Sequence, residues 1–169
     1  DLILSGINHG SNSSISVIYS GTMSAAVEGA LEDIPSIGFS LLDHAYDADF
    51  EPSKFFVNQI ITSFFKSSIR NGLCLNVNIP NVSQENIKGI KICRQAKAVW
   101  VENFDERVNP MGEKYYWLTG KLQLLEEKVD KEIDVVSLEE NYVSVVPVQY
   151  DMTNYSRVAE VKKVFEDLT

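Results

Sequence analysis

The first eighty residues alternate between two kinds of apolar pattern, and this alternation constrains the fold more than any other feature. Apolar runs at residues 2–4, 37–41 and 73–79 are typical of β-strands. Between them, apolar side chains recur at helical spacing in residues 23–31 and 52–64. Strands that alternate with helices of this length form a parallel sheet with helices packed on its faces. The sequence therefore predicts an α/β fold with a Rossmann-like, mostly parallel sheet.

The predicted strands differ in their expected burial. Leu2, Ile3 and Leu4 form a continuous apolar run, which is typical of a strand buried on both faces. Residues 73–79 alternate apolar side chains with Cys and Asn, which predicts a strand with one buried face. A polar loop is expected over residues 6–20, and it is too long to be a simple connection. Long ordered loops that follow strands often carry function.

The second half of the chain is predicted to add an extended hairpin. Aromatic-rich segments within residues 98–118 flank an Asn-Pro-Met-Gly turn. Further elements are expected as a strand at 90–94, a short helix at 134–140, a strand at 142–148 and an amphipathic helix at 158–168. No linker-like stretch rich in Gly, Ser or Pro divides the chain. We therefore expect one domain over residues 1–169.

Composition excludes some classes of partner. The formal net charge of -9 and the sequence pI of about 4.7 argue against binding long nucleic acid, which requires clustered Lys and Arg. The sequence contains neither an apolar run of membrane-spanning length nor the pattern of a signal peptide. We therefore expect a soluble, cytoplasmic protein with no membrane partner. The two cysteines, Cys74 and Cys93, fit no disulfide or zinc pattern and are predicted to be buried free thiols.

The segment SGINHGSN and the YSGT that follows it indicate a site. Ligands of open α/β sheets bind where loops leave the carboxyl ends of strands, and these residues follow the first predicted strand. Ser20, Gly21 and Thr22 stand where the next helix should begin, so backbone N–H groups, two hydroxyls and the helix dipole can converge on an anion. From this triplet alone, simple capping of the helix by Ser20 or Thr22 is the favoured interpretation.

Other polar residues give weaker signals. The amide oxygen of Asn8 is a ligand type that magnesium or manganese accepts, but one oxygen does not make a site. His9 and His44 are expected to be solvated loop residues rather than catalytic bases. A solvated acidic run explains the remaining cluster, which consists of Asp43, Asp47 and Asp49. The chain lacks both the GxxxxGK[ST] and the GxGxxG pattern, which argues against an NTPase or a dinucleotide-binding enzyme.

Four segments in order, DLILSGINHGSN, VIYSGTMSAAVEGALEDIPSIGFSL, LNVNIP and YVSVVPVQYDMTN, resemble the SurE family of metal-dependent nucleotidases. The resemblance implies a single SurE-like domain over residues 1–169, with a hairpin extension at about 98–118 that is used in oligomerisation. It implies that Asn8 is a ligand of a divalent metal, Mg²⁺ or Mn²⁺. The family's phosphate-binding SGT motif corresponds to Ser20, Gly21 and Thr22, and Asn12 would line the same pocket. No catalytic residue is assigned within this chain.

The resemblance also implies an activity. Members of the SurE family are divalent-metal-dependent phosphomonoesterases, so we expect hydrolysis of nucleoside 5'-monophosphates. Nucleoside 3'-monophosphates and short polyphosphate are further candidate substrates. The resemblance also implies a homodimer or homotetramer. Family members carry a paired-aspartate motif and a metal-binding Ser ahead of the segment resembled here. Nothing in this chain replaces them, so we expect an N-terminally incomplete domain that is inactive alone. The alternative is a non-catalytic nucleotide-binding or assembly module.

Overall fold

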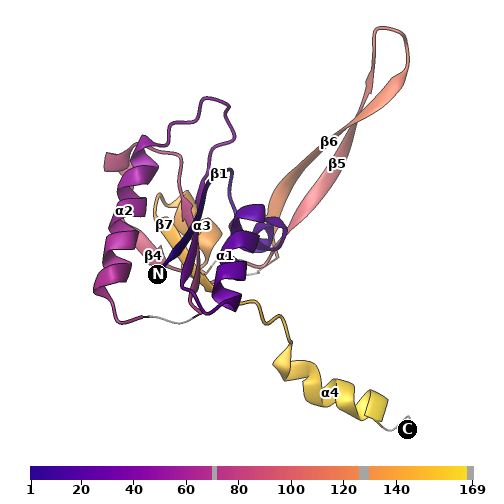
Figure 1. Cartoon of the computed structure of the whole chain (residues 1–169). Coiled ribbons are helices and arrows are strands. Elements are labelled where there is room, and N and C mark those ends of the chain that lie inside the picture. The colour runs from indigo at the N-terminus through magenta and orange to yellow at the C-terminus, as the bar shows by residue number, and fades with distance from the viewer. Residues whose placement is uncertain (70–71, 126–129, 167–169) are drawn as a thin grey trace.

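A mixed, mostly parallel sheet forms the centre of the molecule (Figure 1). The computed structural model describes residues 1–69, 72–125 and 130–166. Within these residues the five-stranded sheet has the order β1-β2-β3-β7-β4, in which β3 and β7 pair antiparallel and the other neighbours pair parallel. The strands are β1 (Ile3–His9), β2 (Ser36–Leu41), β3 (Cys74–Ile79), β4 (Ile90–Ile92) and β7 (Val143–Val148). The predicted α/β class with a mostly parallel sheet is confirmed.

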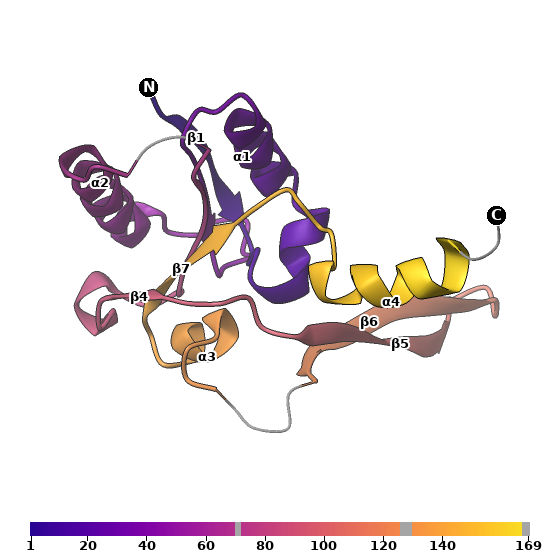
Figure 2. The ribbon, with the colours of Figure 1, turned by 90° about the horizontal axis from the view of Figure 1, so that it is seen from below.

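Two helices cover opposite faces of the sheet, as Figure 2 shows. On one face, α2 (Glu51–Lys66) buries Phe56 and Ile60 against the apolar side chains of β2 and β3. On the other, α1 (Gly21–Leu31) buries Met23 and Ala26. Each helix thus turns its apolar stripe inward, as the helical spacing of these residues predicts.

A glycine on β2 lets α1 approach the sheet closely. A Cβ at Gly38 would lie 2.4 Å from the Sδ of Met23 and 3.6 Å from the carbonyl oxygen of Thr22. Side chains alternate along a strand, so Gly38 and Ser40 share the face that α1 covers. The amino terminus of α1 is therefore held beside the carboxyl end of β2.

The first strand differs from its prediction in two ways. β1 lies at the edge of the described sheet and none of its residues is fully buried, so the expectation of a strand buried on both faces is wrong. It pairs with β2 alone among the described strands. The strand also continues past Gly6 to His9, through a register shift between Ser5 and Asn8. Part of the predicted loop is therefore strand, and Asn8 lies at the carboxyl end of the sheet.

The third strand is more buried than its alternation predicts. Its apolar face packs under α2, but Asn76 and Asn78 on the other face are 2% and 0% exposed. The prediction of one solvent-facing side is wrong because the polar segment that follows β1 lies over this face. The asparagines of β3 are therefore internal hydrogen-bonding groups.

The hairpin projects away from the sheet (Figure 1). It consists of β5 (Ala98–Val108) and β6 (Lys114–Leu124), paired antiparallel from Ala98 with Leu124 to Val108 with Lys114. It is longer than residues 98–118 because β6 continues for six further residues. Most of its side chains are exposed.

Four further helical elements complete the described residues, in addition to the sheet with its two helices and the hairpin. They are η1 (Ser14–Tyr19), η2 (Gln84–Asn86), α3 (Asp134–Glu139) and α4 (Tyr155–Phe165). None of the α4 side chains is buried, and the predicted end of this helix at Leu168 lies outside the described residues. Cys74 and Cys93 are buried and free, as predicted. No described helix is both long enough and apolar enough to span a bilayer.

We predict that Gly6→Ala destabilises the fold. Gly6 has φ +108°, and a Cβ there would lie 2.3 Å from the backbone oxygen of Phe39. The free energy of unfolding should fall by about 2 kcal/mol or more, measured by urea denaturation. Gly21→Ala is the control, because nothing lies within 4 Å of a Cβ at that position. Equal stability of the two variants would contradict the role of Gly6 in the register shift of β1.

Candidate anion-binding site

Two asparagines of β3 hold the segment that follows β1. The backbone N–H of Asn12 donates to Oδ1 of Asn78 (2.8 Å), and Nδ2 of Asn76 donates to the backbone oxygen of Asn12 (2.7 Å). The two asparagines are joined to each other, because Nδ2 of Asn78 donates to Oδ1 of Asn76 (2.9 Å). Both backbone groups of a buried loop residue are thereby satisfied without a strand partner.

The side chain of Asn12 connects the same segment to β2. Its Nδ2 donates to Oγ of Ser40 at 2.7 Å, and the residue is only 5% exposed. Ser40 is also the register partner of Asn8. Since Thr22 lies over Gly38, two residues earlier on the same face, the predicted site residues gather at the carboxyl end of β2. The geometry gives Asn12 a structural role in the loop.

Ser20 is the N-cap of α1, so the capping interpretation of the sequence holds for this residue. Its Oγ accepts from the backbone N–H of Met23 (3.0 Å), and its backbone oxygen accepts from the N–H of Ser24 (2.9 Å). Among the described residues nothing accepts from the N–H groups of Gly21 and Thr22. Capping uses Ser20 as an acceptor, which leaves its hydroxyl proton to donate to a ligand. Capping and anion binding are therefore compatible here.

Unpaired N–H groups at the first turn of a helix form an anion-binding site. Gly21 is exposed and Thr22 is half-buried, so an anion can reach both from solvent. We call Ser20, Gly21 and Thr22 the anion cradle. The absence of a side chain at Gly21 allows close approach of the anion to the backbone.

Asn8 presents a single metal-type ligand. Its Nδ2 donates to the backbone oxygen of Gly10 at 3.0 Å, and its Oδ1 has no hydrogen-bond donor among the described residues. A divalent metal needs several oxygen ligands, and the described residues contain no group of three or more His, Cys, Asp or Glu that could hold one. These residues therefore supply one neutral ligand and not a complete metal site.

The other polar residues near the sheet edge have local partners. The His9 ring packs against Phe50 with ring centroids 4.8 Å apart, and His9 and His44 are both exposed. In the acidic run, the Oδ1 atoms of Asp43 and Asp49 each accept from a backbone N–H two residues further on. These bonds are typical of turn-forming aspartates.

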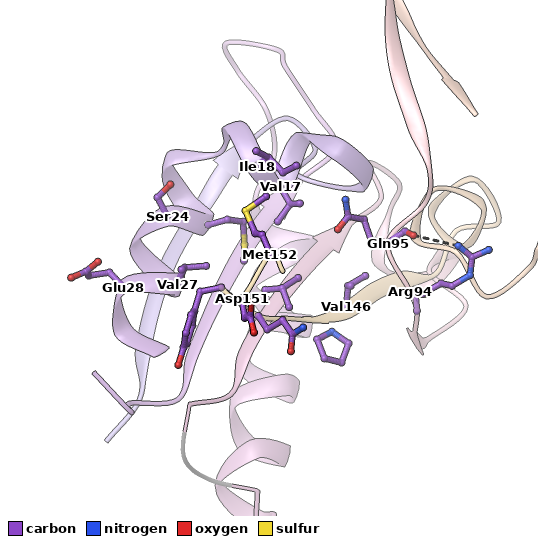
Figure 3. Close-up of a pocket in the computed structure, with 16 residues that line it drawn as sticks. Val17, Ile18, Ser24, Val27, Glu28, Arg94, Gln95, Val146, Asp151 and Met152 are labelled. Carbon is purple, nitrogen blue, oxygen red and sulfur yellow. Dashed lines mark hydrogen bonds between the residues drawn. The ribbon is translucent and has the colours of Figure 1, made fainter. Parts of the chain in front are cut away.

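A separate cavity of ≈ 920 Å³ opens beside α1 (Figure 3). Its walls include Val17 and Ile18 of η1, Val27 of α1 and Val146 of β7, and they are largely apolar. The cavity is lined by none of the predicted site residues. It is therefore distinct from the anion cradle.

Sequence reasoning missed the buried residues that support the site. Asn76 and Asn78 had a visible signal, because two asparagines inside an apolar strand need internal partners. Asp134, which is fully buried at the start of α3, gave no signal. Its Oδ2 accepts from the N–H of Ser14 (2.7 Å) and its Oδ1 from the N–H groups of Ala96 (3.0 Å) and Val135 (2.8 Å). Burial raises the pKa of Asp134 above its ordinary value, and these donors act against that shift.

Fold and geometry together define an α/β protein with two unpaired helix N–H groups at the carboxyl edge of its sheet. The family model described as survival protein SurE matches residues 1–102. A 5'-nucleotidase SurE from Christiangramia forsetii is 56% identical over 161 residues, which cover 95% of this chain and 61% of that protein. A 5'-nucleotidase SurE from Bacteroides thetaiotaomicron is 42% identical, with coverage of 99% and 64%. The chain therefore belongs to the SurE family.

A solved structure agrees with this assignment. The SurE protein from Aquifex aeolicus superposes with a TM-score of 0.79 at 36% identity, covering 97% of this chain and 65% of that one. The chain spans about 61% of the length of the Christiangramia relative. The likeness thus extends over nearly the whole chain but over less than two thirds of its relatives.

We predict that Asn78→Ala loosens the segment over β3. The variant removes the acceptor of the Asn12 N–H and the donor to Asn76, both of which are buried. The free energy of unfolding should fall by about 3 kcal/mol in urea denaturation. Asn86→Ala, at an exposed asparagine bonded to Ser83, should change it by less than about 0.5 kcal/mol. A similar effect of both substitutions would show that the β3 asparagines do not carry this role.

Proposed function

We propose that the chain contributes the phosphate-binding part of a divalent-metal-dependent phosphomonoesterase that hydrolyses nucleoside 5'-monophosphates to nucleoside and phosphate. The observation that carries this proposal is the pair of unpaired N–H groups of Gly21 and Thr22. Thr22 lies over Gly38 of β2, and Asn8 is the register partner of Ser40 two residues further along that strand. Similarity to relatives named 5'-nucleotidases supports the substrate class. Nucleoside 3'-monophosphates and short polyphosphate are further candidate substrates, and the cytoplasm is the proposed location.

The anion cradle binds the substrate phosphate. The N–H groups of Gly21 and Thr22 and the hydroxyls of Ser20 and Thr22 donate to its oxygens, and the positive end of the α1 dipole favours the negative charge. These donors are fixed by the fold before the substrate arrives, so they need no reorganisation as charge shifts during the reaction. The cradle therefore orients the phosphate and stabilises its charge.

Asn8 is proposed as one ligand of the metal, which is Mg²⁺ or Mn²⁺. Its Oδ1 has no competing donor among the described residues, and a neutral amide oxygen suits a hard cation. A metal bound beside the cradle would supply charge neutralisation at the phosphate. The described residues do not complete its coordination, so no catalytic step is assigned to this chain's side chains beyond binding and orientation.

Asn12 is proposed to line the same phosphate site. Its backbone and its Nδ2 are held by β3 and β2, and its Oδ1 has no partner among the described residues. The fixed position of Asn12 keeps the loop closed over the sheet.

A non-catalytic nucleotide-binding module is the alternative function of the chain. The names of the relatives favour an enzyme.

The hairpin is proposed to bind a second copy of the chain in a homodimer or homotetramer. Its register places two apolar pairs, Trp100 with Leu122 and Phe104 with Leu118, on one face of the ribbon. Trp100, Phe104 and Leu118 are 54%, 63% and 58% exposed. A two-stranded ribbon is marginal alone, and large exposed apolar patches mark interaction surfaces.

We predict that Asn8→Ala in the intact enzyme lowers manganese-dependent release of phosphate from a nucleoside 5'-monophosphate by at least about tenfold. Half-maximal activity should also require more manganese, because the variant lacks one oxygen ligand. Both quantities are measured by phosphate release across a manganese titration. Asn86→Ala is the matched control at an exposed site. Unchanged activity and unchanged manganese dependence of Asn8→Ala would remove Asn8 from the site.

We predict that Phe104→Glu reduces the mass of the oligomer in light scattering. The charge would lie opposite Leu118 on the face of the ribbon that a partner covers, and a buried unpaired charge strongly destabilises an interface. Asn103→Glu adds the same charge on the opposite face of the ribbon and should leave the mass unchanged. An unchanged oligomer for Phe104→Glu, or for a variant lacking residues 98–118, would contradict the role of the hairpin in assembly.

A further inference from the structure

Asp134 is a buried carboxylate that the proposed reaction does not use. Its residue is 0% exposed, and its two oxygens accept from the backbone N–H groups of Ser14, Ala96 and Val135 at 2.7 to 3.0 Å. These donors come from three separate places in the fold: the start of η1, the segment before β5, and the first turn of α3. One side chain thus joins three segments that are far apart in the sequence.

The contact at Ser14 fixes one end of η1. Ser14 is fully buried and has φ +53°, a left-handed conformation that non-glycine residues adopt only when their surroundings enforce it. Its N–H donates to Asp134, and its Oγ donates to the backbone oxygen of Ala96 at 3.1 Å. The six-residue η1 then leads directly to Ser20, which caps α1. The position of Ser14 therefore constrains the anion cradle at the other end of this short helix.

The contact at Ala96 reaches the base of the hairpin. Both backbone groups of Ala96 are engaged, the N–H by Asp134 and the carbonyl by Ser14. Ala96 lies two residues before β5 begins and packs with Ile133 and Val136 in a small apolar cluster. The segment before the hairpin and the start of η1 thus bond to the same carboxylate.

We propose that Asp134 is a positioning residue that holds the anion cradle in its binding geometry and couples it to the base of the hairpin. This inference rests on the proposed phosphate-binding function of Ser20, Gly21 and Thr22. A carboxylate suits the task because both of its oxygens accept hydrogen bonds, whereas an amide in its place turns an N–H₂ group toward one of the three donors. The cradle would then shift without any change in its own residues.

The test compares Asp134→Asn with Asp130→Asn. Asp130 is an exposed carboxylate in the preceding segment and bonds to Arg94. Its substitution removes the same charge but none of the three backbone contacts of Asp134. Both variants are made in the intact enzyme. The measurements are the dissociation constant of inorganic phosphate by calorimetry and kcat/KM for a nucleoside 5'-monophosphate, well below the melting temperature of each folded protein. Asp134→Asn should raise the phosphate dissociation constant and lower kcat/KM, each by about tenfold or more. Asp130→Asn should leave both unchanged.

A purely structural role makes a different prediction. Asp134→Asn would then lower the melting temperature and leave phosphate affinity unaltered, and this result would overturn the proposal. If Asp134→Asn does not fold, Ser14→Ala replaces it, because it removes only the bond to Ala96 and should weaken phosphate binding by about threefold, which corresponds to a loss of under 1 kcal/mol. Unchanged phosphate affinity in Ser14→Ala would likewise overturn it. Failure of the proposed function is separate, since it appears as absent turnover and absent phosphate binding in the intact enzyme without substitutions.

Discussion

The need to satisfy the buried backbone of the segment after β1 determines the shape of the site. Residues 12–14 are buried but belong to no β-strand, so their polar groups need partners from side chains. Asn76 and Asn78 supply them for Asn12, and Asp134 supplies one for Ser14. An apolar β3 would leave these groups unpaired, at a cost of about 1–3 kcal/mol each. The polar face of β3 therefore holds the segment that leads to the anion cradle.

Much of the fold follows from pattern alone. The alternation of strands and helices and the helical stripe of α2 were visible as periodicity, because these elements bury one face against a neighbour. The hairpin was visible from its turn and the aromatic-rich segments on either side. The depth of burial was not visible. Asn76 and Asn78 signalled a need for hydrogen-bond partners, but period-two patterning does not reveal whether water or a distant loop supplies them. The position of β1 at the sheet edge depends on pairing partners, which local sequence does not specify.

The residues of the candidate site also differ in how well the sequence predicts them. The helix start at Ser20, Gly21 and Thr22 could be located from sequence, because capping depends on adjacent residues, and the family resemblance alone gave it a role in phosphate binding. Asp134 could not, since its three partners lie up to 120 residues away and involve backbone groups that carry no sequence signal. The net charge of -9 gave no hint of anion binding. A local set of fixed N–H donors can hold one phosphate within an acidic protein, because it acts at short range and bulk charge is screened by salt.

The most direct test of the central claim follows the backbone N–H groups of Gly21 and Thr22 by nuclear magnetic resonance while inorganic phosphate is added to the isotope-labelled protein. The account predicts that these two signals shift most and saturate together, while those of the hairpin strands β5 and β6 stay in place. Binding that shifts residues of the apolar cavity beside α1 and leaves Gly21 and Thr22 unmoved would contradict it.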